Sequence, residues 1–294
     1  MKGLLLVALA ALSWGTTGTV LKLVGAEGAS AALLVGAIRM AIAGPLLLAL
    51  AAARGVPRKL PLPPIALAGA CMAGYQLCYF SAVPRAGVAI TALLAICSAP
   101  ILVAGLAFAL LGERLSWPRA AALAIGVAGA GLLLAGGGAQ VGPRFGLGAA
   151  LALAAGLSYS LYAVITKRAL GEGDPLALSA LTFGMAAVGL APVLAFRWPE
   201  AVALLSRGAP LLVYLGAVAT AGAYWLYSLG LRSVPVSAAV IAGLLEPLVA
   251  TVLGVALFHE QLGASGFAGA ALLVGAVALL GLFSGKVLRP MASG

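Results

Sequence analysis

Long apolar runs, separated by short polar breaks, occupy almost the whole chain. The runs lack an alternation of apolar and polar residues with a period of two, which predicts helices rather than strands. Each run is close to the roughly 20 apolar residues that a helix needs to cross a bilayer. We predict ten spans, at residues 3–24, 31–53, 64–83, 87–111, 117–136, 146–166, 175–197, 209–231, 235–258 and 263–284. The expected fold class is an all-α membrane protein.

The breaks between the runs carry proline, glycine and nearly all of the charged residues, for example at residues 54–63, 136–144 and 198–207. None is long enough for a domain outside the membrane. Composition agrees, because 64% of the residues are hydrophobic and 8% are charged, against about a quarter charged in an average soluble protein. A soluble globule and a disordered chain are both excluded, since disorder needs low hydrophobicity and high charge.

The distribution of positive charge predicts the orientation. Ten spans place both termini on one side of the membrane, and alternate connections starting at the N-terminus hold eleven Lys and Arg residues against five in the other set. Cytoplasmic loops collect these residues, so both termini are expected in the cytoplasm. The net charge of +10 therefore reflects topology. No basic cluster with interleaved aromatic residues is present, and we expect no nucleic-acid partner.

The two halves of the chain repeat each other at an offset that stays between 145 and 151 residues. The matched positions are Ser13-Trp14 and Lys22 with Ser158-Tyr159 and Lys167; Val83-Pro84 with Val234-Pro235; and Pro100, Glu113 and Leu115 with Pro247, Glu260 and Leu262. Five spans per half is an odd number, so the second half should enter the membrane upside down. We predict two inverted five-helix repeats, residues 1–140 and 141–294. This architecture recurs in secondary transporters, with the substrate site near the midplane.

Polar and aromatic residues inside the apolar runs are candidates for binding a substrate, because a dry midplane site needs such groups. The candidates are Trp14 and Thr17 on the first span, Tyr75, Gln76 and Tyr79 on the third, Ser98 on the fourth, Tyr159 on the sixth, Tyr224 on the eighth and Glu246 on the ninth. An aromatic face stabilises an ammonium group by about 0.5–2 kcal/mol. The alternatives are aromatic belts at the membrane interface and hydroxyls that bond their own helix.

Two ionisable residues, Arg39 and Glu246, lie well inside spans. A charge is costly in lipid, so each should face protein or water. Glu246 is either a carboxylate that responds to protons or substrate, or a structural group beside Pro247. For Arg39 we favour a structural role, in which it pairs with Glu246 or bonds carbonyls at a helix end.

Pro100 and Pro247 sit near the middle of their spans. Each lacks an N–H and frees a carbonyl one turn earlier, so each is either a gating hinge or a static kink. Glu113 sits at a turn beside Arg114, which suggests a local cap or ion pair. Small residues at Ala122, Gly126 and Ala130 allow close helix packing within the protein or in a dimer.

These motifs resemble the drug/metabolite transporter superfamily, in its ten-helix EamA-type branch, over essentially the whole chain. The residues that carry the resemblance are Ser13-Trp14-Gly15, Arg39, Ser98-Ala99-Pro100 with Gly112-Glu113-Arg114-Leu115, and Leu245-Glu246-Pro247 with His259-Glu260-Gln261-Leu262. The layout is most similar to bacterial amino-acid exporters, including those for aromatic amino acids. The resemblance implies export of amino acids or related metabolites across the bacterial inner (plasma) membrane by alternating access. It also implies an aromatic-lined central cavity, with Trp14, Tyr75 and Tyr159 in it.

Other function classes find less support in the residues. An enzyme needs a nucleophile with a base, paired carboxylates or metal ligands, and neither the lone His259 nor the three cysteines form such a set. We expect no cofactor and no metal, and the chain has no Walker-type loop for ATP. A passive channel would more naturally be an oligomer around a pore. The main alternative is broad drug or cation efflux, with Glu246 as a cation- or proton-binding carboxylate. The expected partners are a small-molecule substrate and the lipid bilayer, for a monomer, with a dimer as the alternative.

Overall fold

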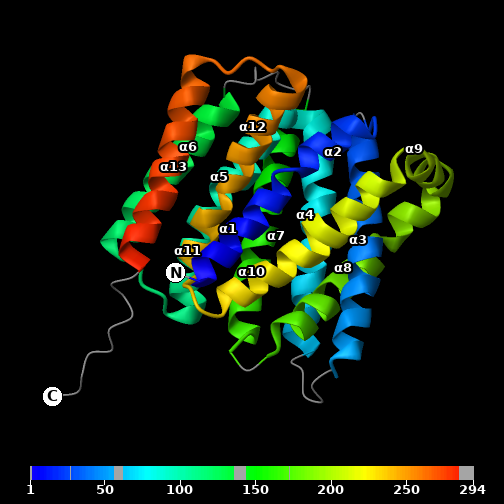
Figure 1. Cartoon of the computed structure of the whole chain (residues 1–294), viewed down its shortest axis with the longest axis horizontal. Coiled ribbons are helices and arrows are strands. Elements are labelled where there is room, and N and C mark those ends of the chain that lie inside the picture. Colours follow the sequence, from blue (N-terminus) through cyan, green and yellow to red (C-terminus); the bar gives the residue numbers. More distant parts are fainter. Residues whose placement is uncertain (1, 27, 56–61, 136–143, 172, 285–294) are drawn as a thin grey trace.

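The protein is a bundle of helices (Figure 1), seen in a computed structural model that describes residues 2–26, 28–55, 62–135, 144–171 and 173–284. The helices are α1 (Lys2–Trp14), α2 (Thr17–Leu23), α3 (Gly28–Ala53), α4 (Leu62–Ala86), α5 (Val88–Leu111), α6 (Trp117–Ala135), α7 (Phe145–Ala169), α8 (Pro175–Phe196), α9 (Trp198–Gly216), the π-helical turn η1 (Ala217–Gly222), α10 (Ala223–Leu231), α11 (Val236–Gly243), α12 (Leu245–Phe258) and α13 (Ala264–Ser284). Within the described ranges, ten helical segments are long and apolar enough to cross a membrane, which confirms the ten predicted spans. The predicted boundary between residues 140 and 141 lies outside the described residues.

The helices are arranged so that α6 and α13 lie together at one edge of the bundle and α3, α8 and α9 at the opposite edge, with the others between them (Figure 1). The α6–α13 contact depends on glycine, because a Cβ on Gly129 would lie 2.9 Å from the carbonyl oxygen of Gly269. Ala122 and Ala130 are fully buried, and a Cβ on Gly126 would meet Leu244 at 2.8 Å. The small-residue stripe therefore serves packing inside the protein.

The first span is broken between α1 and α2. Thr16 Oγ1 donates to the Ser13 carbonyl at 2.7 Å, and the Thr16 N–H donates to the same carbonyl at 3.3 Å. These bonds tighten the chain after α1 and stop the regular α-helical pattern. Gly15 lies at the break, where its backbone packs directly on α12.

The ninth span is also broken, between α11 and α12. The Leu244 N–H donates to the Ile241 carbonyl at 3.1 Å, which closes α11 with a tight turn. Pro247 is the third residue of α12, where a missing N–H costs no helical bond. By contrast, α5 continues as one helix through Pro100. The two matched prolines thus differ, since only Pro247 accompanies a break.

The predicted break at 198–207 is wrong, because these residues form the first half of α9. One face of this segment is apolar: Ala201 and Leu204 are buried in a cluster with Val20 and Leu34, while Arg207 is exposed. The polar residues that suggested a loop therefore lie on the exposed face of a helix. The chain departs from helical geometry at Gly208, whose φ is −152°. The same span then passes through η1, in which Thr220 Oγ1 donates to the Leu215 carbonyl at 2.7 Å.

Candidate functional site

A central cavity of about 950 Å³ is bounded by α1 to α6 on the side of the first half and by α7, α10, α11 and α12 on the other. Eight of the nine predicted substrate-binding residues line it, namely Trp14, Thr17, Tyr75, Gln76, Tyr79, Tyr159, Tyr224 and Glu246, together with both predicted hinge prolines, Pro100 and Pro247. Ser98 is not among the lining residues. Its hydroxyl donates to the Ala95 carbonyl at 3.4 Å, and it sits against Gly156 of α7.

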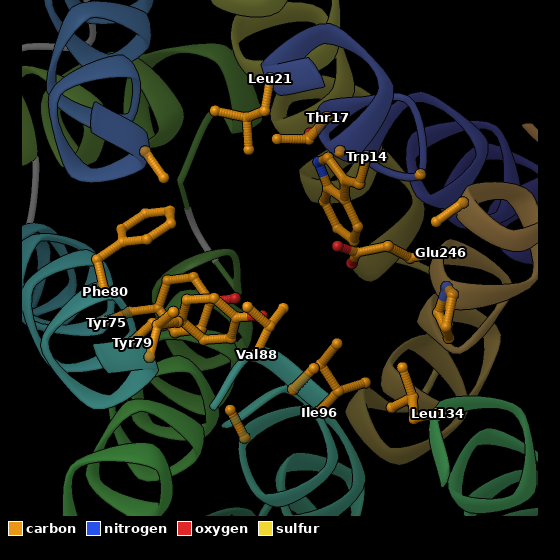
Figure 2. A pocket seen from close by; sticks show the side chains of 18 of the residues that line it. Trp14, Thr17, Leu21, Tyr75, Tyr79, Phe80, Val88, Ile96, Leu134 and Glu246 are labelled. Atoms are coloured by element: carbon orange, nitrogen blue, oxygen red, sulfur yellow. The ribbon is translucent and has the colours of Figure 1, made fainter. Parts of the chain in front are cut away.

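Aromatic rings form two groups around the cavity. In one, the Trp14 ring centroid is 4.8 Å from that of Tyr224. In the other, Tyr75 is 5.8 Å from Tyr79 and 6.0 Å from Tyr159. Figure 2 shows Tyr75 and Tyr79 across the cavity from Trp14. Ring contacts of this kind hold the rings in fixed orientations, so the cavity has stable aromatic faces.

Glu246 projects its carboxylate into the cavity beside Trp14 (Figure 2). It lies in the first turn of α12, just after the helix break. Among the described residues, its side chain makes no ion pair and no hydrogen bond with another side chain or the backbone. A carboxylate in the first turn is favoured by the helix dipole. The carboxylate therefore sits at the N-terminal end of α12 with its oxygens facing the cavity.

Arg39 does not behave as predicted. Within the described ranges, it forms neither the ion pair with Glu246 nor the bonds to helix-end carbonyls that we expect from the sequence. Instead its guanidinium, on α3, donates through Nε at 3.2 Å and Nη2 at 2.5 Å to the amide oxygen of Gln76 on α4. Both residues line the cavity and both are buried. The cavity therefore carries a cation on the α3–α4 side and an anion on the α12 side.

One end of the cavity is its mouth, which we define by Lys22, Ala26, Val88, Phe258 and Glu260. Lys22 and Glu260 form an ion pair there, with both side chains about half exposed. The Lys22 ammonium also lies 4.5 Å from the centroid of the Phe258 ring. Lys22 and Phe258 lie in the last turns of α2 and α12, Ala26 and Glu260 follow these two helices, and Val88 begins α5.

The opposite end of the bundle is sealed by polar contacts near the end of α5. Glu113 accepts hydrogen bonds from the backbone N–H groups of Val236 at 3.0 Å and Ser237 at 3.3 Å, and from the Ser237 hydroxyl. Its ion-pair partner is Arg119, at 3.2 Å, rather than the adjacent Arg114 that we predict. Glu113 thus caps the start of α11 from the other half of the chain.

Comparison with known proteins decides the family. The model of the EamA-like transporter family matches the chain twice, at residues 1–135 and 146–282. The chain belongs to the EamA-like transporter family. The two matches cover the two halves separately, which agrees with the repeat seen in the sequence.

Two relatives of this EamA transporter are themselves described as uncharacterised transporters. The uncharacterised transporter YwfM of Bacillus subtilis (strain 168) is 39% identical over 280 residues, which is 92% of this chain and 90% of YwfM. An uncharacterised transporter of Archaeoglobus fulgidus is 30% identical over 199 residues, covering 68% of this chain and 69% of the relative. A protein of known crystal structure has the same fold, with a TM-score of 0.80 and 25% identity over 98% of this chain and 99% of its own.

The chain is therefore a multi-pass membrane transporter of the drug/metabolite transporter superfamily, and its family and relatives are transporters. Sequence reasoning missed the partnership of Arg39 with Gln76 and the mouth pair of Lys22 with Glu260. The first left one signal, an arginine inside an apolar span. The second left another, because Lys22 and Glu260 each have a matched residue in the other half.

Proposed function

We propose that the protein exports amino acids and related small metabolites across the inner (plasma) membrane of a bacterium by alternating access. The observation that supports this most directly is the free carboxylate of Glu246, which faces an aromatic cavity of about 950 Å³ beside Trp14. A carboxylate and a tryptophan face together suit an ammonium group. Thr17, Tyr75, Gln76, Tyr79, Tyr159 and Tyr224 complete the proposed substrate site.

The proposed orientation follows from the positive charge of alternate loops, which places both termini in the cytoplasm. The mouth lies at the end of α2, and α1 begins at the opposite end of the first span. The mouth then faces the outside, and the cytoplasmic end is sealed by Glu113. Residues 1–140 and 141–294 act as inverted repeats that rock against each other. Pro247, at the α11–α12 break, and Pro100 serve as the hinges.

A second function, efflux of cationic drugs, is favoured by the same unpaired carboxylate. A lipophilic cation needs an aromatic cavity and one anionic group, and Glu246 supplies that group. The two functions differ in the cargo that competes for the cavity. Zwitterions compete for an amino-acid site, whereas lipophilic cations compete for a drug site.

The test is uptake of labelled amino acids into proteoliposomes that contain the unlabelled compound. We expect saturable exchange of at least one amino acid. Substitution of Trp14 by alanine should lower that exchange by about tenfold, because the lost ring contact with an ammonium is worth about 1–2 kcal/mol. Trp117→Ala is the matched control, since Trp117 is 82% exposed at the start of α6 and does not line the cavity. Movement of lipophilic cations without any amino acid would reject the amino-acid function in favour of drug efflux.

A further inference from the structure

We propose that Arg39 and Gln76 form a carboxylate-binding subsite in the cavity, so that the site selects zwitterions over simple amines. This inference rests on the proposed function and deepens it. The ligand is bound at two ends, with its carboxylate at Arg39 on α3 and its ammonium at Glu246 on α12.

The guanidinium of Arg39 has donors left for a ligand. Gln76 takes Nε and Nη2 through one amide oxygen, whereas a guanidinium carries five N–H donors. Only 9% of the Arg39 residue surface is exposed, and no acidic side chain in the described part of the chain lies within ion-pair distance of it. Burying an arginine without an anionic partner lowers the stability of the protein. A ligand carboxylate supplies that partner, since arginine binds carboxylates in a bidentate manner.

Gln76 positions the arginine for this task. Its own exposure is 1%, and its amide accepts from the Nε edge of the guanidinium. That contact ties α3 to α4 and restricts rotation of the planar group. A preorganised guanidinium loses less entropy when it binds an anion.

The balance of charge in the cavity also fits a zwitterion. Four charged side chains line it among the described residues: Lys22 and Glu260 neutralise each other at the mouth, and Arg39 and Glu246 remain unpaired deeper in. Arg39 and Glu246 interact electrostatically with each other and with Tyr75 and Tyr224. A ligand with one positive and one negative group therefore pairs with both Glu246 and Arg39, whereas an amine pairs with Glu246 and leaves Arg39 without an anion.

The test compares L-phenylalanine with 2-phenylethylamine, which differs from it by the absence of the carboxylate. Binding of each ligand is measured in two ways: by how strongly it inhibits amino-acid exchange in proteoliposomes, and by how far it shifts the thermal midpoint of the purified full-length protein. We expect Arg39→Gln to lower the affinity for L-phenylalanine by about tenfold to thirtyfold and to change the affinity for the amine by less than about twofold. Arg39→Lys keeps the charge and should restore part of the affinity for L-phenylalanine. Arg85→Gln is the control, since Arg85 is on α4 but does not line the cavity.

The outcomes separate the subsite from the proposed function. If Arg39→Gln and Arg39→Lys each lower the affinity for both ligands equally, the role of Arg39 is structural. This result would overturn the subsite and leave the proposed function standing. Unchanged preference for L-phenylalanine in Arg39→Gln would do the same. If the wild-type protein binds no amino acid, the proposed function and the subsite both fall.

A different set of observations, at the two ends of the bundle, carries a second inference. At the sealed end, Pro235 has no N–H to offer the Leu231 carbonyl, and the Lys167 ammonium donates to that oxygen instead, at 2.6 Å. Lys167 also donates to the Val234 carbonyl at 2.8 Å. Together with the cap that Glu113 places on α11, these contacts join the ends of α5, α7 and α10 to the start of α11.

The mouth contains the matched residues in a different arrangement. Lys22 matches Lys167, Glu260 matches Glu113, and Pro84 matches Pro235. Pro84 likewise leaves the Phe80 carbonyl without its helical donor, and Phe80 lines the cavity. Among the described residues, no side chain caps the start of α5, and Val88 there is 66% exposed. Lys22 and Glu260 bond each other rather than these two sites.

We infer that, when the mouth closes, Lys22 and Glu260 separate and make the contacts that their matched residues, Lys167 and Glu113, make at the sealed end. Glu260 then caps the start of α5, and Lys22 binds the freed Phe80 carbonyl. The exposed pair is weak, whereas a cap on a buried helix start is stronger. The matched glutamates therefore stabilise opposite states: Glu113 the state with an open mouth, and Glu260 the state with a closed one.

The test is the labelling rate of Val88→Cys by a polar maleimide, with Cys71, Cys78 and Cys97 replaced by alanine. Val88 lines the cavity at the mouth and is 66% exposed, so closure of the mouth should bury it. We expect Glu113→Gln to slow labelling and Glu260→Gln to speed it, while both slow exchange. Glu200→Gln, which removes a carboxylate outside the cavity, should change neither. Shifts in the same direction for Glu113→Gln and Glu260→Gln, or no shift in either, would overturn the inference.

Discussion

Replacing Glu246 with glutamine is expected to lower exchange of an ammonium-bearing substrate by about a hundredfold. The substitution keeps the size of the side chain and removes the charge that faces the cavity beside Trp14. A hydrogen bond to a charged group contributes about 1.5–3 kcal/mol, and each 1.4 kcal/mol corresponds to about a tenfold change in affinity. The measurement is the exchange rate of L-phenylalanine in proteoliposomes at equal amounts of reconstituted protein.

The control for this prediction is Glu200→Gln. Glu200, in the first turn of α9, pairs with Arg197 just before that helix and is about half exposed, so its loss should change exchange by less than about twofold. If a pH gradient accelerates exchange by the wild-type protein, Glu246→Gln should abolish that acceleration as well. Full activity in Glu246→Gln would mean that the carboxylate only supports the α11–α12 break, and the ammonium site would have to lie elsewhere.

Much of the fold follows from the sequence because lipid leaves the backbone few choices. Each long apolar run must become a helix, since its N–H and C=O groups find no water in the bilayer. The prediction of a break at 198–207 failed because this segment is amphipathic rather than uniformly apolar, with Ala201 and Leu204 facing the core. The breaks at Gly15 and Leu244 lie inside apolar runs, where hydropathy carries no signal for them. Pro247 alone marked one of these breaks in advance.

The site was predictable where residue type alone restricts the role of a side chain. Aromatic and ionisable residues inside spans face protein or a cavity rather than lipid, and Tyr75, Tyr224 and Glu246 all line the cavity. Ser98 was not, because a small hydroxyl can bond its own helix, as it does with Ala95. The partner of Arg39 depends on how α3 packs against α4. That register is set by side-chain packing between helices, which a single sequence does not show.

A methyl group at Gly15 is expected to cost the protein both stability and most of its transport. A Cβ at this position would lie 2.5 Å from the Cβ of Val249 and 2.8 Å from the carbonyl oxygen of Glu246. Both atoms are close to the α12 backbone, so the helix would have to move. Overpacking of this kind costs about 1–3 kcal/mol. We therefore expect Gly15→Ala to lower the thermal midpoint by several degrees and exchange by more than about tenfold, since the movement displaces Glu246.

Gly18→Ala provides the matched control for the Gly15 prediction. Gly18 also lines the cavity, about one turn further along the first span in α2, but a Cβ there meets nothing within 4 Å. The two variants add the same methyl group to neighbouring turns of one span, so a difference between them isolates the contact with α12. If Gly15→Ala keeps both stability and exchange, the broken ends of the first and ninth spans do not need to touch. The position of Glu246 would then be set by α11 and α12 alone.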